Sequence, residues 1–429
     1  MPQIKPFRGV LYNSKKVDSP TVVAPPYDVI SPQIQDELYR ANEYNIIRLI
    51  LGKEEAADSK RSNKYKRANR FFTKWLNNKI LIQDTKPSVY VYSQEYFHKD
   101  KKRVRLGFIA RMRIEDPRKS KVLPHEYTFA KPKQDRLQLI RETKANLSPI
   151  FTLFQDEGNK VISILKGAIK KRPIFDIEYE GVRNKVWRLA DKGSIKKIQA
   201  VIDDKDIYIA DGHHRYEVAV SYRDEMRKKQ QRQKSNGHNY VMMYLSPLNQ
   251  KGVTVFSTHR LIRDINMGIK EVLKRLKPYF YIKAFKSGKR LFEEMVSAKV
   301  GNYVFGMYVN NKTFYLLKLK RETILDDVLK DDHSKERKRL DVSILHGLVL
   351  DHIIGLRKHT QDEDNIIYTR DPNYAINMVD KGNCQVAFFL NPTKVHQVQS
   401  LAKKGHRMPH KSTYFYPKLL SGLVINKLV

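Results

Sequence analysis

Three observations predict that this 429-residue chain has an α/β fold of the mixed α+β kind. Hydrophobic residues make up 41% of the chain, and their spacing changes repeatedly between strand-like alternation and a helical repeat. The segment 207–226 has the pattern of a strand, a sharp glycine turn and a helix. The length exceeds what one ordinary core accommodates. We therefore expect an α/β core within a chain of two or three domains.

Local signals predict each element in turn. The proline-rich stretch 24–30 is unsuited to a central helix or strand, and Ser31 with Pro32 then forms an N-cap and first-turn pair for a short helix over 33–39. A helical repeat covers 60–77, and a charged turn at Lys99–Lys102 joins two alternating strands. The polar tract 228–239 is expected to be an exposed loop. The remaining predictions are strands at 89–92, 104–110, 149–154, 207–210, 240–245, 303–309, 313–318, 366–369 and 386–390, and helices at 135–143, 215–226, 342–354 and 374–379.

The charge balance bears on the partners of the chain. Lysine and arginine number 82 against 46 acidic residues, which gives a formal net charge of +36. Such a charge attracts polyanions, so nucleic acid is a candidate partner. The basic runs are scattered, however, and no single basic stripe with interleaved aromatic residues stands out. Simple solvation of the surface therefore remains the alternative to nucleic-acid binding.

The chain lacks the signals of secreted and membrane proteins. Its longest apolar runs are far too short to span a bilayer, so we expect no membrane partner. The N-terminus shows no apolar signal-peptide region, and a cytoplasmic location is the default expectation. The single cysteine, Cys384, can close no internal disulfide and is expected to be a core residue in a reducing compartment.

The strongest candidate for chemistry is the turn from Asp211 to Arg215. Gly212 permits a tight turn and close approach of a ligand to the backbone. Arg215 offers a planar fork for phosphate oxygens, and the following helix adds N–H donors and its dipole. Asp211 could position a metal or a hydroxyl group. The alternatives are a metal-free structural turn with two surface histidines, or a zinc site, although His213 and His214 are adjacent and such pairs rarely share one metal. We predict a phosphate-binding loop.

A second candidate is the loop that contains His125, Glu126 and Tyr127. A carboxylate beside loop hydroxyl groups can serve as a general base, and the basic residues that follow, Lys133 and Arg136, could bind phosphate. The alternative is a solvated charged loop.

A third candidate lies near the C-terminus. Lys411, Ser412 and Thr413 are residue types that bind phosphate, but no GxxxxGK precedes them, so they do not form a P-loop. A docking strand that packs through 414–416 is the alternative.

These motifs carry a resemblance. The segment Ile209–Ala219, IADGHHRYEVA, resembles the DGHHR-type box of the ParB/sulfiredoxin superfamily. Over nearly the full chain the pattern also resembles a prokaryotic family of unknown function that carries this box. The resemblance implies a ParB/sulfiredoxin-like nucleotide-binding core over 104–250, an N-terminal family-specific lobe over 1–103, and a C-terminal α+β lobe over 251–429 that includes the MPHKSTYFYPK tail. The segments that carry the wider likeness are Pro6–Gly9, Pro25–Val29, Asn146–Phe151 and Met408–Thr413.

Within the superfamily, the order of motifs is similar to that of free serine kinases: a His-Glu segment, a helix, a Pro-Ile strand and the DGHHR box. The likeness implies phosphotransfer from ATP or ADP, with Mg²⁺, to a small hydroxylated metabolite such as free serine. It implies Glu126 as the base towards the hydroxyl group with Asp211 assisting, and His213, His214 and Arg215 as phosphate ligands. The present chain departs from the pattern because 155–205 separates the strand from the box.

Other branches of the superfamily imply other functions. Sulfiredoxin chemistry needs a cysteine beside the Gly-His-Arg core, and this sequence has none there. A ParB-like protein that binds CTP and acts on DNA draws on the same box and on the net charge, but no helix-turn-helix is evident after residue 250. A non-catalytic metabolite sensor is the third alternative.

Overall fold

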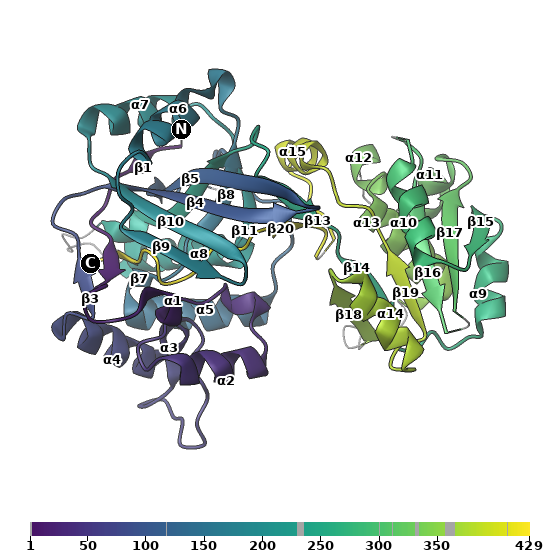
Figure 1. Cartoon of the computed structure of the whole chain (residues 1–429), viewed down its shortest axis with the longest axis horizontal. Helices are drawn as coiled ribbons and strands as arrows, with labels where there is room; N and C mark the ends of the chain where they lie inside the picture. Colours follow the sequence, from purple (N-terminus) through teal and green to yellow (C-terminus); the bar gives the residue numbers. More distant parts are fainter. Residues whose placement is uncertain are drawn as a thin grey trace. The chain divides into compact units, whose positions relative to one another are not determined.

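The computed structural model describes residues 2–116, 118–229, 236–299, 301–310, 312–330, 334–356, 365–409 and 411–429 (Figure 1). Residues 230–235 of the predicted loop tract and His410 of the tail motif lie outside this part. The contacts divide the chain into two compact units. The first unit comprises Met1–Pro124, Thr128–Thr254 and Pro417–Val429, and the second comprises His125–Tyr127 and Val255–Tyr416. The domains expected at 1–103, 104–250 and 251–429 stay a prediction. The limits of the units differ from them, since 1–103 and 104–250 share one unit.

The first unit is built on a mixed nine-stranded sheet. Its strand order is β6-β11-β8-β12-β5-β4-β10-β9, with β1 paired to β5. The pairs β11·β6 and β12·β8 are parallel, and the other pairs are antiparallel. The strands are β1 (Ile4–Lys5), β4 (Val89–His98), β5 (Lys101–Arg113), β6 (Val122–Leu123), β8 (Ile150–Phe154), β9 (Phe175–Tyr179), β10 (Val182–Leu189), β11 (Ile207–Asp211) and β12 (Tyr240–Pro247).

Helices pack around this sheet. In Figure 1, α6 and α7 lie along one side of the sheet and α4 and α5 on the other, while α8 packs against α5. Two short antiparallel pairs, β2 (Val10–Tyr12) with β3 (Leu81–Gln83) and β7 (Ala145–Asn146) with β21 (Asn426–Lys427), complete the unit. Its helices and helical turns are α1 (Ser19–Val22), η1 (Tyr27–Val29), α2 (Pro32–Ala41), α3 (Ile47–Ile50), α4 (Lys64–Asn77), α5 (Ala130–Thr143), η2 (Glu157–Asn159), α6 (Lys160–Ala168), α7 (Lys192–Ile202), α8 (His213–Lys229) and η3 (Gly237–Asn239).

The two faces of the first sheet differ in polarity because side chains alternate along each strand. Val91 of β4 and Phe108 of β5 lie in the apolar core with residues of α6 and α7. On the opposite face the same strands carry Tyr92, Gln94 and Arg105, all buried. A buried polar row on a sheet needs hydrogen-bond partners. The C-terminal segment supplies some of them.

The second unit contains a six-stranded antiparallel sheet of order β15-β17-β16-β19-β14-β18. A separate ribbon pairs β13 with β20. The strands are β13 (Thr254–Phe256), β14 (His259–Ile262), β15 (Phe280–Phe285), β16 (Val304–Val309), β17 (Thr313–Leu319), β18 (Ile366–Thr369), β19 (Val386–Phe389) and β20 (Tyr414–Tyr416). The helices are α9 (Ile269–Leu276), α10 (Gly288–Ser297), α11 (Ile324–Val328), α12 (Lys335–Lys338), α13 (Asp341–Ser343), η4 (Ile344–Ile354), α14 (Pro372–Asp380) and α15 (Val395–Lys403).

The mixed α/β class predicted from the sequence is confirmed, and the ends of several elements are corrected. The helix expected from residue 60 begins at Lys64, because the side chain of Asn63 accepts the N–H groups of Tyr65 and Lys66. The charged turn of the first hairpin consists of Lys99 and Asp100, which both have positive φ.

Two further helices differ from expectation. The helix expected at 135–143 begins earlier, at Ala130. The segment expected to be an amphipathic helix at 342–354 is π-helical over Ile344–Ile354 and largely buried. Its apolar side chains are enclosed on more than one side, so a one-faced pattern does not describe it.

Two other expectations concern single features. Cys384 is buried in an apolar cluster of the second unit, as predicted. Within the described residues, no helix is long and apolar enough to cross a membrane.

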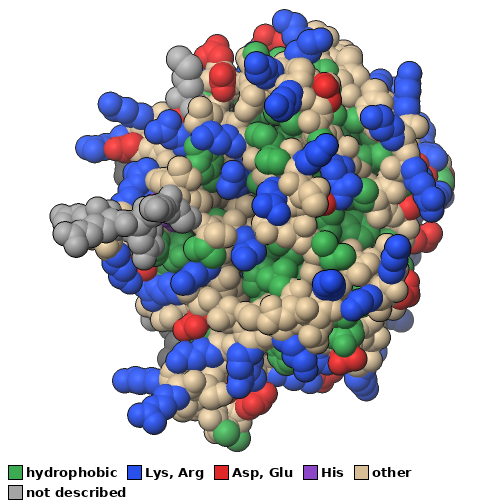
Figure 2. Space-filling model, turned by 90° about the vertical axis from the view of Figure 1, so that its left-hand side faces the viewer, with side chains coloured by type: hydrophobic (Ala, Val, Ile, Leu, Met, Phe, Trp, Pro, Cys, Tyr) green, Lys and Arg blue, Asp and Glu red, His purple; other side chains and the backbone are tan. Residues whose placement is uncertain are grey.

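Figure 2 shows one face of the molecule, on which Lys and Arg side chains are scattered among apolar patches and fewer acidic groups.

The close approach of β5 to β12 makes a prediction about stability. A Cβ atom on Gly107 would lie 2.5 Å from the carbonyl oxygen of Leu245, so Gly107→Ala is expected to cost about 1–3 kcal/mol of unfolding free energy. The matched control is Gly167→Ala in α6, where no atom lies within 4 Å of the added Cβ. That change should be neutral or stabilise by about 0.5 kcal/mol. Chemical denaturation measures both, and equal effects would contradict the packing described for Gly107.

Candidate functional site

Strand β11 passes into helix α8 through Gly212. This residue has φ +93°, and a Cβ atom here would lie 2.8 Å from Nε of Arg215. Glycine is therefore required for two reasons: it adopts the left-handed backbone conformation, and it leaves room for the guanidinium of Arg215 to pack against the turn. Helix α8 begins at His213, two residues before the start predicted from the sequence. His213 and His214 thus lie in the first turn, where backbone N–H groups lack partners within the helix.

The carboxylate of Asp211 lies between two cations. Its Oδ2 accepts a hydrogen bond from Nη2 of Arg215 at 2.6 Å, and its Oδ1 accepts one from Nζ of Lys418. All three side chains are largely buried, with 11–13% of their surface exposed. The contact joins residues 207 positions apart in the chain. Lys418 is therefore a site residue that sequence reasoning missed.

The electrostatics of Asp211 follow from this arrangement. Burial opposes ionisation, but the adjacent Lys418 and Arg215 outweigh it and hold the pKa of Asp211 below its ordinary value. Asp211 is thus ionised at neutral pH. The two cations, Arg215 and Lys418, thus lie beside the start of α8, where the helix dipole adds a partial positive charge.

A second carboxylate, that of Asp28, belongs to the same site. It lies on the turn η1, and the residue is exposed. Partial desolvation of the carboxyl group and the negative charge of Asp211 both raise the pKa of Asp28. No local pattern in the sequence gives Asp28 a role by itself, but it belongs to the Pro25–Val29 motif that contributes to the family resemblance. The motif is the feature of the sequence from which a role for Asp28 could have been inferred.

The first unit brings several sequence motifs together around Asp211. The carbonyl oxygen of Pro149 accepts a hydrogen bond from Nη1 of Arg215. The hydroxyl groups of Ser148 and Ser421 lie 2.6 Å apart, and the backbone of Ser421 pairs with that of Ala24. Segments 25–29, 146–151 and 209–219, which carried the family resemblance, therefore meet at one place.

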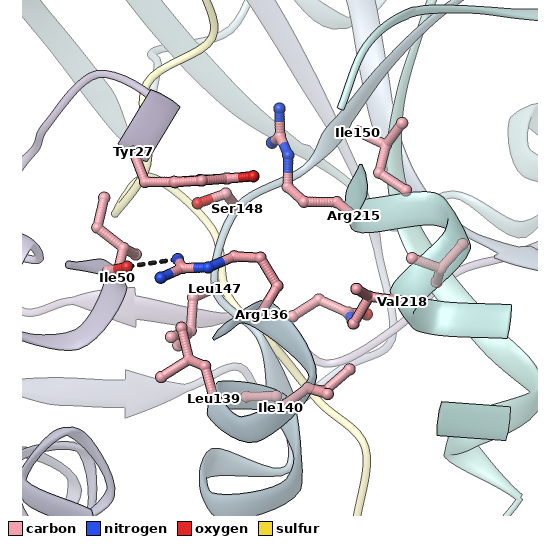
Figure 3. A pocket seen from close by; sticks show the side chains of 13 residues that line it. Tyr27, Ile50, Arg136, Leu139, Ile140, Leu147, Ser148, Ile150, Arg215 and Val218 are labelled. Carbon is pink, nitrogen blue, oxygen red and sulfur yellow. Dashed lines mark hydrogen bonds between the residues drawn. The ribbon is translucent and has the colours of Figure 1, made fainter. Parts of the chain in front are cut away.

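A small cavity of about 60 Å³ adjoins this site (Figure 3). The side chain of Arg136 is part of the cavity wall. The guanidinium of Arg136 lies 4.2 Å from the ring centre of Tyr27, and it donates hydrogen bonds to the carbonyl of Ile50 and the carboxylate of Asp135. The remaining lining is mostly apolar. It comprises Leu139, Ile140, Ala145, Asn146, Leu147, Ser148, Ile150, Arg215, Val218 and Val241.

The other predicted phosphate ligands of the first unit already have protein partners. Nζ of Lys133 lies 3.1 Å from Oε2 of Glu217. Nε2 of His214 accepts the backbone N–H of Phe129 at 3.0 Å, which places the proton of a neutral ring on Nδ1. Burial lowers the pKa of His214, despite the nearby carboxylates of Asp28 and Glu217. These contacts fix the start of α5 against α8. His213 is buried at the first position of α8.

The second and third candidate motifs meet in the second unit. Oγ1 of Thr413 donates to Oε1 of Glu126 at 3.1 Å and lies 3.1 Å from Nε2 of the buried His125. An isolated bridge joins the backbones of Glu126 and Met408. Sequence reasoning treated these motifs separately, since 287 positions divide Glu126 from Thr413.

The remaining predicted residues surround this cluster. The carbonyl of Lys411 accepts a hydrogen bond from Nη2 of the buried Arg260 at 3.1 Å, and the hydroxyl of Ser412 donates to the carbonyl of Pro409. Tyr127 is half exposed. The predicted catalytic pair of Glu126 and Asp211 thus belongs to two different units, and its joint action stays a prediction.

The chain thus has a mixed α/β fold in which the strand-to-helix turn brings two cations and two carboxylates together. The chain belongs to the family described as protein of unknown function (DUF1015), whose model matches residues 4–343. No curated protein matches the chain at a significant level.

Several solved structures show distant likeness. A conserved hypothetical protein from Pyrococcus furiosus is 13% identical, with a TM-score of 0.32, over 69% of this chain and 87% of that one. A free serine kinase in complex with AMP is 13% identical, with a TM-score of 0.31, over 69% and 83%. A C-terminally truncated SbnI from Staphylococcus aureus is 10% identical, with a TM-score of 0.34, over 71% and 83%.

The ion pairs of Asp211 make a prediction about stability and pH. Asp211→Asn leaves two buried cations without their carboxylate and is expected to cost about 3 kcal/mol of unfolding free energy at neutral pH. The folded-state pKa of Asp211 lies below its ordinary value of 3.8, so its contribution is present above that value and is lost as the pH falls through the lowered pKa. The difference between wild type and variant should therefore shrink in acid.

Denaturant titrations at pH 7 and pH 3 provide the measurement. Glu157→Gln is the control, because Glu157 is 72% exposed in its pair with Lys205, and such pairs contribute about 0–1 kcal/mol. A cost for Asp211→Asn as small as that of the control would contradict the ion-pair arrangement.

Proposed function

We propose that the first unit binds an adenine nucleotide, ATP or ADP, at the turn from Asp211 to Arg215, and that the protein transfers a phosphoryl group to a small hydroxylated metabolite such as free serine. One observation carries the proposal. Asp211 is held ionised between Arg215 and Lys418 at the start of α8. The order of the sequence motifs, similar to that of free serine kinases, supports the same assignment.

Phosphoryl transfer depends mostly on positioning and on neutralising charge, and the groups at this turn support the proposal because they can contribute to both. Arg215 provides N–H donors, and its buried Nε has no hydrogen-bond partner among the described residues. The first turn of α8 adds backbone N–H groups and the positive end of the helix dipole. These groups can hold phosphate oxygens close to the carboxylates.

The proposed reaction has a simple balance. The acceptor oxygen forms a bond to the terminal phosphorus of the nucleotide, and the bond from that phosphorus to the bridging oxygen breaks. The nucleotide leaves with one phosphate fewer, and the proton of the acceptor hydroxyl passes to a carboxylate base.

The residues present also fit a nucleotide-bound Mg²⁺. Magnesium is commonly held by one or two carboxylates together with phosphates and water. Asp28 is such a carboxylate, and Asp211 lies beside it with its two oxygens paired to Arg215 and Lys418. Among the described residues, no group of three or more His, Cys, Asp or Glu side chains could hold a metal ion. An ion bound by phosphates as well as by protein is consistent with this smaller set.

We propose Glu126 as the base, which is what the resemblance implies. Glu126 is one-sixth exposed and is oriented by the hydroxyl of Thr413, which suits a carboxylate that accepts a proton. Within the first unit, Asp28 is the carboxylate beside Asp211 and is the second candidate for the base.

Turnover is the first test of the proposal. We expect the purified protein, given ATP or ADP, Mg²⁺ and serine, to form phosphoserine that ³¹P NMR detects. Asp211→Asn should lower the rate by about 100-fold or more, the size of effect typical for a group that acts on proton transfer or charge.

Other ligands in the same assay separate the alternatives. CTP-dependent binding of duplex DNA without phosphotransfer would favour the ParB-like alternative. Nucleotide binding without turnover on serine or other hydroxylated acceptors would favour a sensor. Either result would contradict the proposed phosphotransfer.

Two variants test which carboxylate is the base. We expect Glu126→Gln to lower kcat by about 100-fold while the affinity for ADP changes little, because the amide keeps the shape and the bond from Thr413 but accepts no proton. Asp28→Asn is the matched variant in the first unit. A large loss of kcat for Asp28→Asn alone would show that the assignment to Glu126 is wrong.

A further inference from the structure

The C-terminal segment of the chain runs across the polar face of the first sheet. Its end is fixed by the β21·β7 pair and by backbone hydrogen bonds between Ile425 and Val10. Nearer the site, Ser421 pairs with Ala24. Between this pair and the start of the segment at Pro417, the backbone is held by side chains of the sheet.

Arg105 of β5 is the centre of this attachment. Its guanidinium is fully buried, lies 4.3 Å from the ring centre of Phe151, and donates hydrogen bonds to the carbonyl of Pro417 and to the side chain of Gln94. Gln94 in turn donates to the carbonyl of Lys418 at 2.9 Å. Two consecutive carbonyl groups of the segment are thus bound from the sheet.

A buried guanidinium is costly unless hydrogen bonds and packing compensate for its lost hydration. Burial lowers the pKa of Arg105, but an arginine keeps its charge in proteins. Burying the charge of Arg105 therefore costs desolvation free energy at the position that holds the C-terminal segment.

This attachment of the backbone also determines where the ammonium group of Lys418 lies. With its carbonyl bound by Gln94, Lys418 directs its ammonium group to Oδ1 of Asp211. Arg215 takes the other carboxylate oxygen. An ammonium group carries three N–H donors, so one lysine can bridge a carboxylate and a phosphate oxygen.

We propose that Lys418 binds a phosphate oxygen of the nucleotide in the site around Asp211, and that Arg105 is a positioning residue that holds the C-terminal segment so that Lys418 reaches this site. The inference rests on the proposed function for the identity of the ligand. It adds a phosphate ligand from a segment that the family model, which ends at residue 343, does not cover.

Calorimetric titration of the full-length protein with ADP tests the role of Lys418. Lys418→Met should weaken the binding of ADP by about 10- to 100-fold, the ratio expected for loss of one charge-assisted hydrogen bond. Lys418→Arg should retain part of the affinity. Lys427→Met, in the same segment but within β21, is the matched control and should leave the affinity unchanged.

A double-variant cycle tests the role of Arg105. Arg105→Met should weaken ADP binding in the same direction as Lys418→Met. If Arg105 acts through Lys418, the variant with both changes should lose no more affinity than Lys418→Met alone. A purely structural role would instead give additive losses that follow the fall in melting temperature. If Arg105→Met does not fold, Gln94→Met, which removes the bond to the carbonyl of Lys418, takes its place in the cycle.

The outcomes separate this inference from the proposed function. Wild-type protein that binds ADP with the same affinity as Lys418→Met would overturn the role of Lys418 and leave the nucleotide site in place. Additive losses in the cycle would overturn the positioning role of Arg105. Wild-type protein that binds no nucleotide would overturn the proposed function and, with it, this inference.

Discussion

The buried guanidinium of Arg105 is the interaction on which the arrangement of the first unit depends. A charge on the inner face of a sheet must be met by hydrogen bonds, and here Gln94 and the carbonyl of Pro417 supply them. The requirement ties the last residues of the chain to strands formed by its first quarter. Because Lys418 follows Pro417 directly, satisfying the sheet also brings a cation to Asp211. The same C-terminal segment therefore supplies a hydrogen-bond acceptor to the buried Arg105 and a cation to Asp211.

Two cations and two carboxylates lie together around Asp211. Arg215 and Lys418 face one carboxylate that stays ionised, while Asp28, beside it, has a raised pKa. Two neighbouring carboxylates with pKa values shifted in opposite directions are a common arrangement where acid–base chemistry occurs. A helix start and an arginine are groups that bind phosphate well.

The path of the chain explains why the motifs are so widely spaced. Between β6 and α5 the chain contributes three residues, His125–Tyr127, to the second unit, where Thr413 holds Glu126 and contacts His125. It then returns to the first unit, and it does so again at Pro417 after building the second sheet. Each unit therefore gathers motifs from distant parts of the sequence, and each holds part of the predicted machinery.

Local patterns in the sequence were enough to predict the α/β class, several strands of both large sheets, and the strand–glycine–helix turn at Asp211–Arg215. These depend on local periodicity and on the φ angle that glycine allows. Capping by Asn63 and the early start of α8 shifted the ends of helices, because such ends depend on single hydrogen bonds. Only the tertiary structure placed Lys418 and Asp28 beside Asp211, and Thr413 beside Glu126. Nothing local distinguishes Lys418 from the other lysines of this basic chain, since its role arises from a buried arginine more than 300 positions away.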